Sequence, residues 1–212
     1  MTGEILGRDF YQRDPKIVAR QLLNKVLIHG NRSARLVEVE AYCGAIDPGS
    51  HAFRGRTKRN ATMFGPAGGL YVYFTYGMHW CANAVCGDVD EGVAVLLRAA
   101  APLTGLEEMR VARGVVAKRD RDLCSGPAKL CQAFGLDRAH DGADLVTGDR
   151  GVVIVHDGVP PPRRPGNSVR IGLNAGADHP WRWYVEGDPN VSVVKFRTAL
   201  RTRPSRSSPR TR

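Results

Sequence analysis

The segment 35–42 (RLVEVEAY) constrains the fold most, because charged or bulky side chains alternate along it with small apolar ones. A period of two is typical of a strand with two unlike faces. One face would carry two glutamates with a leucine and a tyrosine: Leu36, Glu38, Glu40 and Tyr42. The other would carry Val37, Val39 and Ala41. We expect the valine face to pack on a core, which leaves the glutamate face for solvent or for a site.

Six further segments have the β-branched, aromatic or apolar composition of strands. They are residues 25–29, 69–75, 93–99, 152–156, 169–173 and 183–186, and a turn is expected at Gly30-Asn31. Because these strands do not alternate regularly with helices, we expect an α+β domain with a largely antiparallel sheet rather than a doubly wound fold.

Three helices are predicted from residues that typically begin and end helices. The predicted N-caps are Asp14 (before Pro15), Thr104 (with Glu107 at the capping-box spacing) and Ser125. The first helix should end at about Leu23, and the second at about Arg113, with Gly114 as its stop. The third should run through Lys129 and end just before Gly135.

Composition narrows the class of protein. Of 212 residues, 42% are hydrophobic and 25% charged, which is ordinary for a folded globular chain. No apolar run approaches the roughly 18 residues of a spanning helix, and residues 1–10 lack the apolar stretch of a signal peptide. We therefore expect a cytoplasmic protein in a DNA-containing compartment, with no membrane partner.

The net charge of +10 is unevenly distributed. Seven basic and no acidic residues follow Asp188, so residues 1–188 carry only +3. A tail rich in Arg, Ser and Pro is expected to stay disordered. It would either hold phosphates weakly and salt-dependently or serve solubility.

The forty residues between Asp47 and Asp88 contain no acid. This acid-free segment has four basic residues in its first part: Arg54, Arg56, Lys58 and Arg59. Seven aromatic residues are interleaved with them or follow: Phe53, Phe64, Tyr71, Tyr73, Phe74, Tyr76 and Trp80. The combination suits a surface that holds phosphates and stacks on bases. An aromatic core strand beside a solvated basic loop would give the same pattern.

The two glutamates of the first strand could perform acid–base chemistry. Side chains two apart on one strand face lie about 7 Å from each other, so one carboxylate can raise the pKa of the other. Arg98 ends an apolar strand and needs a carboxylate partner there. The spacing does not say which glutamate would act. An exposed strand face, or a metal-dependent nuclease with Glu38 and Glu40 as ligands, also fits.

The five cysteines do not predict a disulfide framework or a familiar zinc site. Their number is odd, and no two have the C-x-x-C spacing. We interpret them as small buried apolar residues, and metal ligation together with His51 or His79 is the lesser alternative.

Six motifs together resemble the alkyladenine (3-methyladenine) DNA glycosylase family. In chain order they are RLVEVEAY, SHAFRGRTKRN, MFGPAGGLYVYFTYGM, AVLLRAAAPLTGLEEMR, LCSGPAKLCQAFG and WYVEGDPNVSV. The resemblance runs from about residue 6 to residue 194 and is loosest over residues 137–165. It implies one compact α+β domain with a curved antiparallel sheet, which we place over residues 1–196. The basic tail, 197–212, is not part of that pattern, since some relatives carry a basic extension at the N-terminus instead.

The resemblance also implies an activity: hydrolysis of the N-glycosidic bond of an alkylated or deaminated purine flipped out of double-stranded DNA. No cofactor and no metal would be needed, and no lysine would cleave the strand. One pocket on one small domain favours a monomer, although the oligomeric state stays open. By motif position, Glu40 would activate water and Arg98 would hold that water or orient Glu40.

Further roles follow from the same motif positions. Tyr42, His51 and Tyr73 would form stacking walls, and Asn83 would meet the purine edge. Tyr76 would fill the gap left in the duplex. Candidates for contacts to the DNA backbone are Arg56, Arg59, Asn60 and Lys129. Thr75, His79 and Trp80 depart from the family pattern near Tyr76. The accepted lesions stay open, and so do a non-catalytic binding module and an inactive relative.

Overall fold

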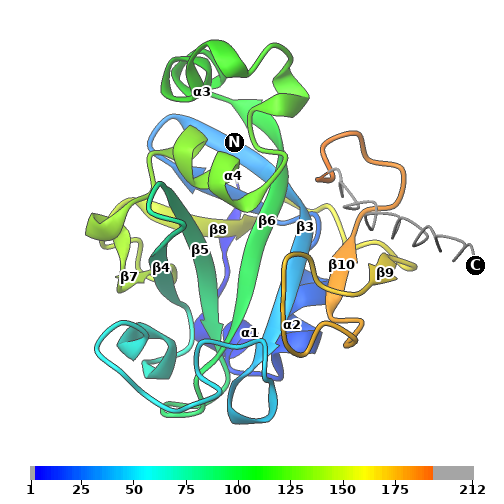
Figure 1. The fold of residues 1–212 in the computed structure, drawn as a ribbon. Coiled ribbons are helices and arrows are strands. Elements are labelled where there is room, and N and C mark those ends of the chain that lie inside the picture. The colour runs from blue at the N-terminus through cyan, green and yellow to red at the C-terminus, as the bar shows by residue number, and fades with distance from the viewer. Residues whose placement is uncertain (1–2, 193–212) are drawn as a thin grey trace, which may run out of the picture.

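Two long antiparallel strands, β3 (Arg32–Cys43) and β6 (Val93–Thr104), form the centre of the sheet (Figure 1). The computed structural model describes residues 3–192. The remaining strands are β1 (Glu4–Ile5), β2 (Val26–His29), β4 (Gly69–Thr75), β5 (His79–Cys86), β7 (Ala143–Asp144), β8 (Val152–His156), β9 (Gly166–Ser168) and β10 (Arg182–Tyr184). Eight of the ten strands follow the order β1-β8-β2-β3-β6-β5-β4-β7, and beside this path β10 pairs with both β3 and β9. Every pairing is antiparallel. The described residues form a single α+β domain, as predicted.

A bulge in the middle of β3 decides which way its side chains face. Leu36 pairs with Ala100 and Glu38 with Ala99, so Val37 is the extra residue. Such a bulge shifts the alternation and increases the twist of the strand. Leu36 consequently joins Val39 and Ala41 in the main core. The predicted grouping of Leu36 with the glutamates is therefore wrong, because a strict period of two does not survive the bulge.

Four helices accompany the sheet: α1 (Arg8–Tyr11), α2 (Pro15–Leu22), α3 (Leu106–Arg113) and α4 (Pro127–Phe134). Side chains of α2 and α4 enter the main core beside β3, β5 and β6. A second, smaller core cluster lies under the loop that follows β3, which is cyan in Figure 1. It consists of Ala52, Met63, Phe64, Tyr71, Val85 and Ala94.

One of the three predicted N-caps is confirmed. Asp14 accepts a hydrogen bond from the Lys16 amide at 2.7 Å and begins α2. Thr104 is not a cap, because it ends β6 and its hydroxyl bonds Ser33 Oγ at 2.7 Å. Ser125 is not a cap either, since α4 begins after Gly126 and Ser125 Oγ accepts a bond from Lys129 instead. The glycine stops, Gly114 and Gly135, are confirmed.

Two strand predictions need correction. Strand β5 is absent from the predicted strands, because HWCANAVC shows no regular alternation of polar and apolar residues. The predicted strand over residues 169–173 is wrong, since these residues form a loop after β9. There Arg170 turns inward to a buried aspartate, and Gly172 takes φ +78°. Strands β2, β4 and β8 agree with prediction within a residue, whereas β6 continues to Thr104 and β10 occupies residues 182–184.

All five cysteines are buried and unpaired within the described residues, which confirms their interpretation as buried apolar residues. Among residues 3–192, no helix has the length and apolarity needed to cross a membrane. The predicted tail, 197–212, and its boundary at residue 196 lie outside the described residues.

Candidate active site

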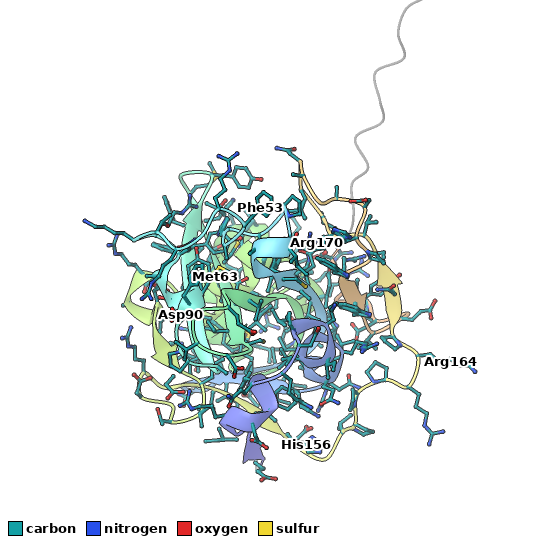
Figure 2. All side chains as sticks on the ribbon, turned by 90° about the horizontal axis from the view of Figure 1, so that it is seen from below. Phe53, Met63, Asp90, His156, Arg164 and Arg170 are labelled. Atoms are coloured by element: carbon teal, nitrogen blue, oxygen red, sulfur yellow. The ribbon has the colours of Figure 1, made fainter. Side chains whose placement is uncertain are left out.

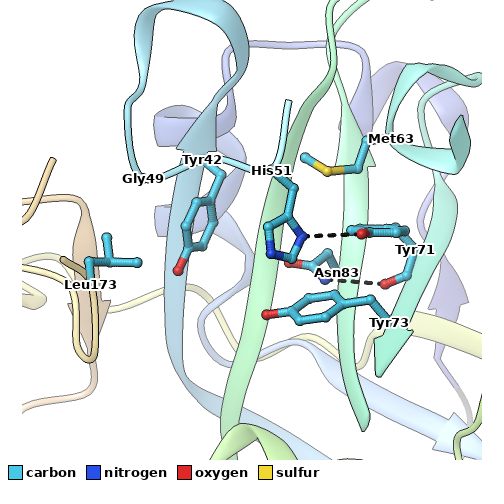
Figure 3. A pocket seen from close by; sticks show the side chains of 8 residues that line it. All are labelled: Tyr42, Gly49, His51, Met63, Tyr71, Tyr73, Asn83 and Leu173. Atoms are coloured by element: carbon cyan, nitrogen blue, oxygen red, sulfur yellow. Dashed lines mark hydrogen bonds between the residues drawn. The ribbon is translucent and has the colours of Figure 1, made fainter. Parts of the chain in front are cut away.

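A pocket opens between the sheet and two loops, one after β3 and one between β9 and β10. Strands β3, β4 and β5 supply Tyr42, Tyr71, Tyr73 and Asn83, and the loops supply Gly49, His51, Met63 and Leu173. Figure 3 shows Tyr42 and Leu173 on one side, Tyr71 and Tyr73 on the other, and His51 between them. All four predicted pocket residues (Tyr42, His51, Tyr73 and Asn83) therefore meet in one place, and Met63, Tyr71 and Leu173 were not predicted there.

The aromatic walls are fixed by contacts with one another. Tyr71 and Tyr73 stack with ring centroids 5.3 Å apart, and His51 meets Tyr73 edge-on at 4.5 Å. His51 Nδ1 lies 3.1 Å from the Tyr71 hydroxyl. Partial burial and the nearby Arg59 lower the pKa of His51, which favours the neutral form of its ring. The walls are thus aromatic on both sides and can stack on a flat ring.

Asn83 lies at the back of the pocket and is almost fully buried. Its Nδ2 donates to the backbone oxygen of Tyr71 at 3.2 Å, which fixes the plane of the amide. A fixed amide can distinguish ligands by the hydrogen-bonding groups along their edges.

Glu40 is fully buried at the base of the pocket wall. Its Oε1 accepts the Ile171 amide at 2.8 Å and lies 3.3 Å from Arg98 Nη1. Its Oε2 accepts the Tyr42 hydroxyl at 3.0 Å. Burial and the Glu40 carboxylate raise the pKa of Tyr42, so that hydroxyl remains a donor. Glu40 is therefore held by one cation while touching a wall of the pocket.

Glu38 is also fully buried but is used differently. Its Oε1 accepts Arg98 Nε at 2.9 Å, Arg182 Nε at 2.7 Å and Ser192 Oγ at 2.8 Å, and its Oε2 accepts the Ser192 amide at 2.7 Å. Burial alone would raise the pKa of Glu38, but the two arginines and these hydrogen bonds lower it overall. Glu38 is a structural anion that anchors Arg98.

The structure thus separates the two glutamates that the sequence spacing left equivalent. The interpretation as an exposed strand face is wrong, because neither carboxylate reaches solvent. Glu38 as a metal ligand is disfavoured, since arginines and a serine already occupy its oxygens. Among residues 3–192, no three His, Cys, Asp or Glu side chains are arranged to hold a metal ion.

A buried ion pair that the sequence analysis missed holds the two loops together. Arg170 Nη1 lies 2.5 Å from Asp47 Oδ2, and its Nη2 lies 2.7 Å from Oδ1. Arg170 also donates to Ala41 O at 3.0 Å and lies over the Tyr42 ring at 4.6 Å. The pair therefore positions the Ile171 amide against Glu40. The argument that identified Arg98, an arginine among apolar residues, applies equally to Arg170 and was the available signal.

The remaining predicted residues lie outside the pocket. Tyr76 is 81% exposed, has φ +52° and stands in the turn between β4 and β5. Arg56 pairs with Asp90 at 3.2 Å at the surface, and Arg59 donates to Phe74 O at 3.1 Å. Lys129 lies on α4, with Nζ 3.1 Å from Ser125 Oγ.

Asn60 is an exception among the predicted surface contacts, because it is only 2% exposed. Its Nδ2 donates to His51 O at 2.8 Å and Gly55 O at 3.1 Å, and its Oδ1 accepts the Thr57 amide at 2.6 Å. These bonds hold the loop that carries His51, and they leave Asn60 no exposed group for a phosphate.

A buried carboxylate beside a pocket with stacked aromatic walls and a basic rim is suited to hydrolysing a bond next to a flat, base-like ring. These features are those expected of an enzyme that acts on nucleobases. Comparison with known proteins gives the family: residues 9–189 match the profile described as methylpurine-DNA glycosylase (MPG). The chain belongs to the methylpurine-DNA glycosylase family, DNA-repair enzymes that remove alkylated bases, and the resemblance noted in the sequence is confirmed.

Relatives from three bacteria extend this finding. A protein of Burkholderia lata is 56% identical over 191 residues, which cover 90% of this chain and 92% of that protein. Proteins of Streptomyces avermitilis (45% over 204 residues; 93% and 95% covered) and Chlorobaculum tepidum (43% over 197 residues; 90% and 91% covered) are also similar. All three carry the name "Putative 3-methyladenine DNA glycosylase".

Proposed function

We propose that this chain excises 3-methyladenine and related damaged purines from double-stranded DNA, and that it does so by hydrolysis alone. One observation carries the proposal: the Glu40 carboxylate is buried, is contacted by Arg98, and accepts a hydrogen bond from the hydroxyl of Tyr42, which lines the aromatic pocket. The names of the relatives support the substrate.

The pocket accounts for the choice of substrate. A base must leave the duplex to be reached, at a cost of a few kcal/mol. Stacking between Tyr42, His51 and Tyr73 returns roughly 1–3 kcal/mol per base. An alkylated purine is cationic, and electron-rich tyrosine faces favour a desolvated cation by up to about 2 kcal/mol. Asn83 at the purine edge would clash with the exocyclic amino group of normal guanine.

Hydrolysis needs a directed water molecule and a stabilised cation. As the glycosidic bond breaks, its electron pair goes to the purine and positive charge develops at C1′ of the sugar. The Glu40 anion favours that charge, accepts a proton from water and directs the hydroxyl oxygen to C1′. Arg98 holds Glu40 in place. The products are a free base and an intact abasic site, and no lysine nucleophile is required.

Residues at the surface would make the contacts to DNA. We propose Tyr76 as the side chain that fills the gap in the duplex, because it stands at the tip of the β4–β5 hairpin. Arg56, Arg59 and Lys129 remain proposed contacts to phosphates. For Asn60 we propose a structural role in its loop instead.

The test is base release in the presence of a chelator. Substrates are methylated genomic DNA and duplexes that carry one hypoxanthine or one ethenoadenine. Wild type should release base, and Glu40→Gln should not, while both bind the duplex equally. Glu108→Gln, at an exposed position on α3, is the matched control and should be fully active. Activity that depends on a metal would favour the nuclease alternative, and lesion binding without release would favour a binding module.

A further inference from the structure

A groove on the outer edge of β4 begins where the base pocket ends. It measures about 360 Å³ and shares Tyr73 with the pocket. Arg59 connects the two, since it lines the groove and its charge acts on His51 and Tyr71 in the pocket. The groove therefore offers a continuous path for a strand whose base enters the pocket.

The groove carries an excess of positive charge. Lys58, Arg59 and Arg138 line it and are exposed. Within residues 3–192, Lys58 and Arg138 form no ion pair. The single carboxylate, Asp141, is already bonded to the Val72 amide at 3.0 Å. Two cations are thus free to meet an anion.

The groove also offers an aromatic surface. Phe74 and Trp80 lie with ring centroids 4.8 Å apart, and Phe74 is 44% exposed. Cations that follow a backbone, with an aromatic face beside them, are the two elements of a site for unpaired nucleotides. An extended peptide fits less well, because the outer edge of β4 is already occupied at Val72 N by Asp141 and at Phe74 O by Arg59.

We propose that this groove binds the nucleotides that flank the flipped base on the same DNA strand. Lys58 and Arg138 would contact their phosphates, and Phe74 would stack on a base or pack against a sugar. The inference rests on the proposed function. It adds to that function a second binding site, which adjoins the lesion pocket but is distinct from it and from the hairpin tip at Tyr76.

The first test is charge reversal. Lys58→Glu combined with Arg138→Glu should reduce the slope of log Kd against log salt by about two, one for each lost phosphate contact. The ratio of its Kd to that of wild type should then fall roughly tenfold as the salt concentration rises from 50 to 200 mM. The matched control is Arg163→Glu with Arg164→Glu, which changes the net charge equally. Both arginines are exposed, and Arg164 projects from the loop between β8 and β9, away from Phe53 (Figure 2).

The second test shortens the lesion strand of the duplex one nucleotide at a time from either end. Wild type should lose affinity abruptly when one end approaches the lesion, and the double variant should not. Phe74→Ala should weaken binding to the full-length duplex by roughly fivefold to a hundredfold. Single-turnover release at saturating enzyme should stay close to wild type in every variant.

The outcomes separate this inference from the proposed function. If wild type releases no base, the function fails first. If wild type is active but the double variant matches the control in salt slope and in response to strand length, the groove does not bind DNA. A groove that serves a protein partner would give that same result, so it overturns the proposal.

Discussion

The base of the pocket and the rim around it are built in opposite ways. At the base, three carboxylates and three arginines are buried and paired: Glu38, Glu40, Asp47, Arg98, Arg170 and Arg182. At the rim, Arg59 and Lys58 are exposed, and Tyr76 and Met78 protrude from the hairpin. The proposed catalytic geometry is therefore set before DNA arrives, whereas the proposed DNA-contacting groups are free to adapt.

This difference predicts that variants at the base lose rate or stability, and that variants at the rim lose affinity. Preorganised charge costs no reorganisation during the reaction, which is why burial is useful at the base. Exposed charges are screened by salt and contribute mainly to association.

The largest expected effect is the loss of rate in Glu40→Gln. General-base catalysis contributes roughly 10²–10⁴-fold, so single-turnover release should fall by at least about a hundredfold. The neighbouring Glu38→Gln should instead destabilise the fold by about 3–5 kcal/mol, because it leaves Arg98 and Arg182 without their shared anion. Denaturant unfolding would measure the change in stability, and single-turnover kinetics would measure the change in rate. Equal effects of the two substitutions on rate and stability would refute the division of roles.

The next effect concerns the ion pair between Arg170 and Asp47. Arg170→Lys keeps the charge but loses the bidentate geometry, so we expect a loss of about 2–4 kcal/mol in stability. The loosened Ile171 amide should lower kcat more than it raises KM. Arg35→Lys, in the ion pair with Asp157 that bridges β3 to the end of β8, is the control and should leave kcat unchanged. A normal kcat in Arg170→Lys would mean that Glu40 does not depend on this pair.

The base of the site should also respond to acid. The folded-state pKa of Glu38 is lowered from 4.5, and that of Asp47 from 3.8, mainly by the arginines that offset their burial. A depressed pKa contributes stability that is present above the unfolded value and lost as pH falls through the folded value. Unfolding free energy should therefore drop below about pH 4.5. Glu38→Gln should flatten that drop, and an unchanged pH profile would contradict it.

The smallest expected effect lies at the rim. Tyr76→Ala should change stability by less than about 0.5 kcal/mol, because the side chain is exposed. It should reduce release from duplex DNA about tenfold by weakening flipping, which costs a few kcal/mol. A fluorescent base beside the lesion would report flipping directly. Unchanged flipping would remove Tyr76 from the mechanism, and Val115→Ala on the exposed turn after α3 provides a control.

Local sequence patterns predicted elements well where local interactions decide them. Helix α2 follows from Asp14 and Pro15, and strands β4 and β8 follow from their composition. Predictions failed where a distant partner overrides the local preference. Thr104 has the spacing of a cap, but the hydroxyl of Ser33, on the other long strand, binds it into the sheet.

The loop 169–173 is a second such failure. Its alternation in SVRIGL resembles a strand, yet Arg170 binds Asp47, which lies 123 residues earlier in the chain. No local pattern contains that information. The same separation explains why the sequence alone did not place Leu173 or the Ile171 amide at the pocket.

The sequence by itself determined the fold class, the family and four of the residues that meet in the pocket (Tyr42, His51, Tyr73 and Asn83), because motif positions and local composition carry that information. Only the tertiary structure decided what distinguishes the two buried glutamates. Glu38 is bound by Arg98, Arg182 and Ser192, which lie 60, 144 and 154 residues away, and Glu40 is left beside the pocket. The charge state and freedom of a buried carboxylate depend on its partners in space, and these partners come from strands and loops that only folding brings together.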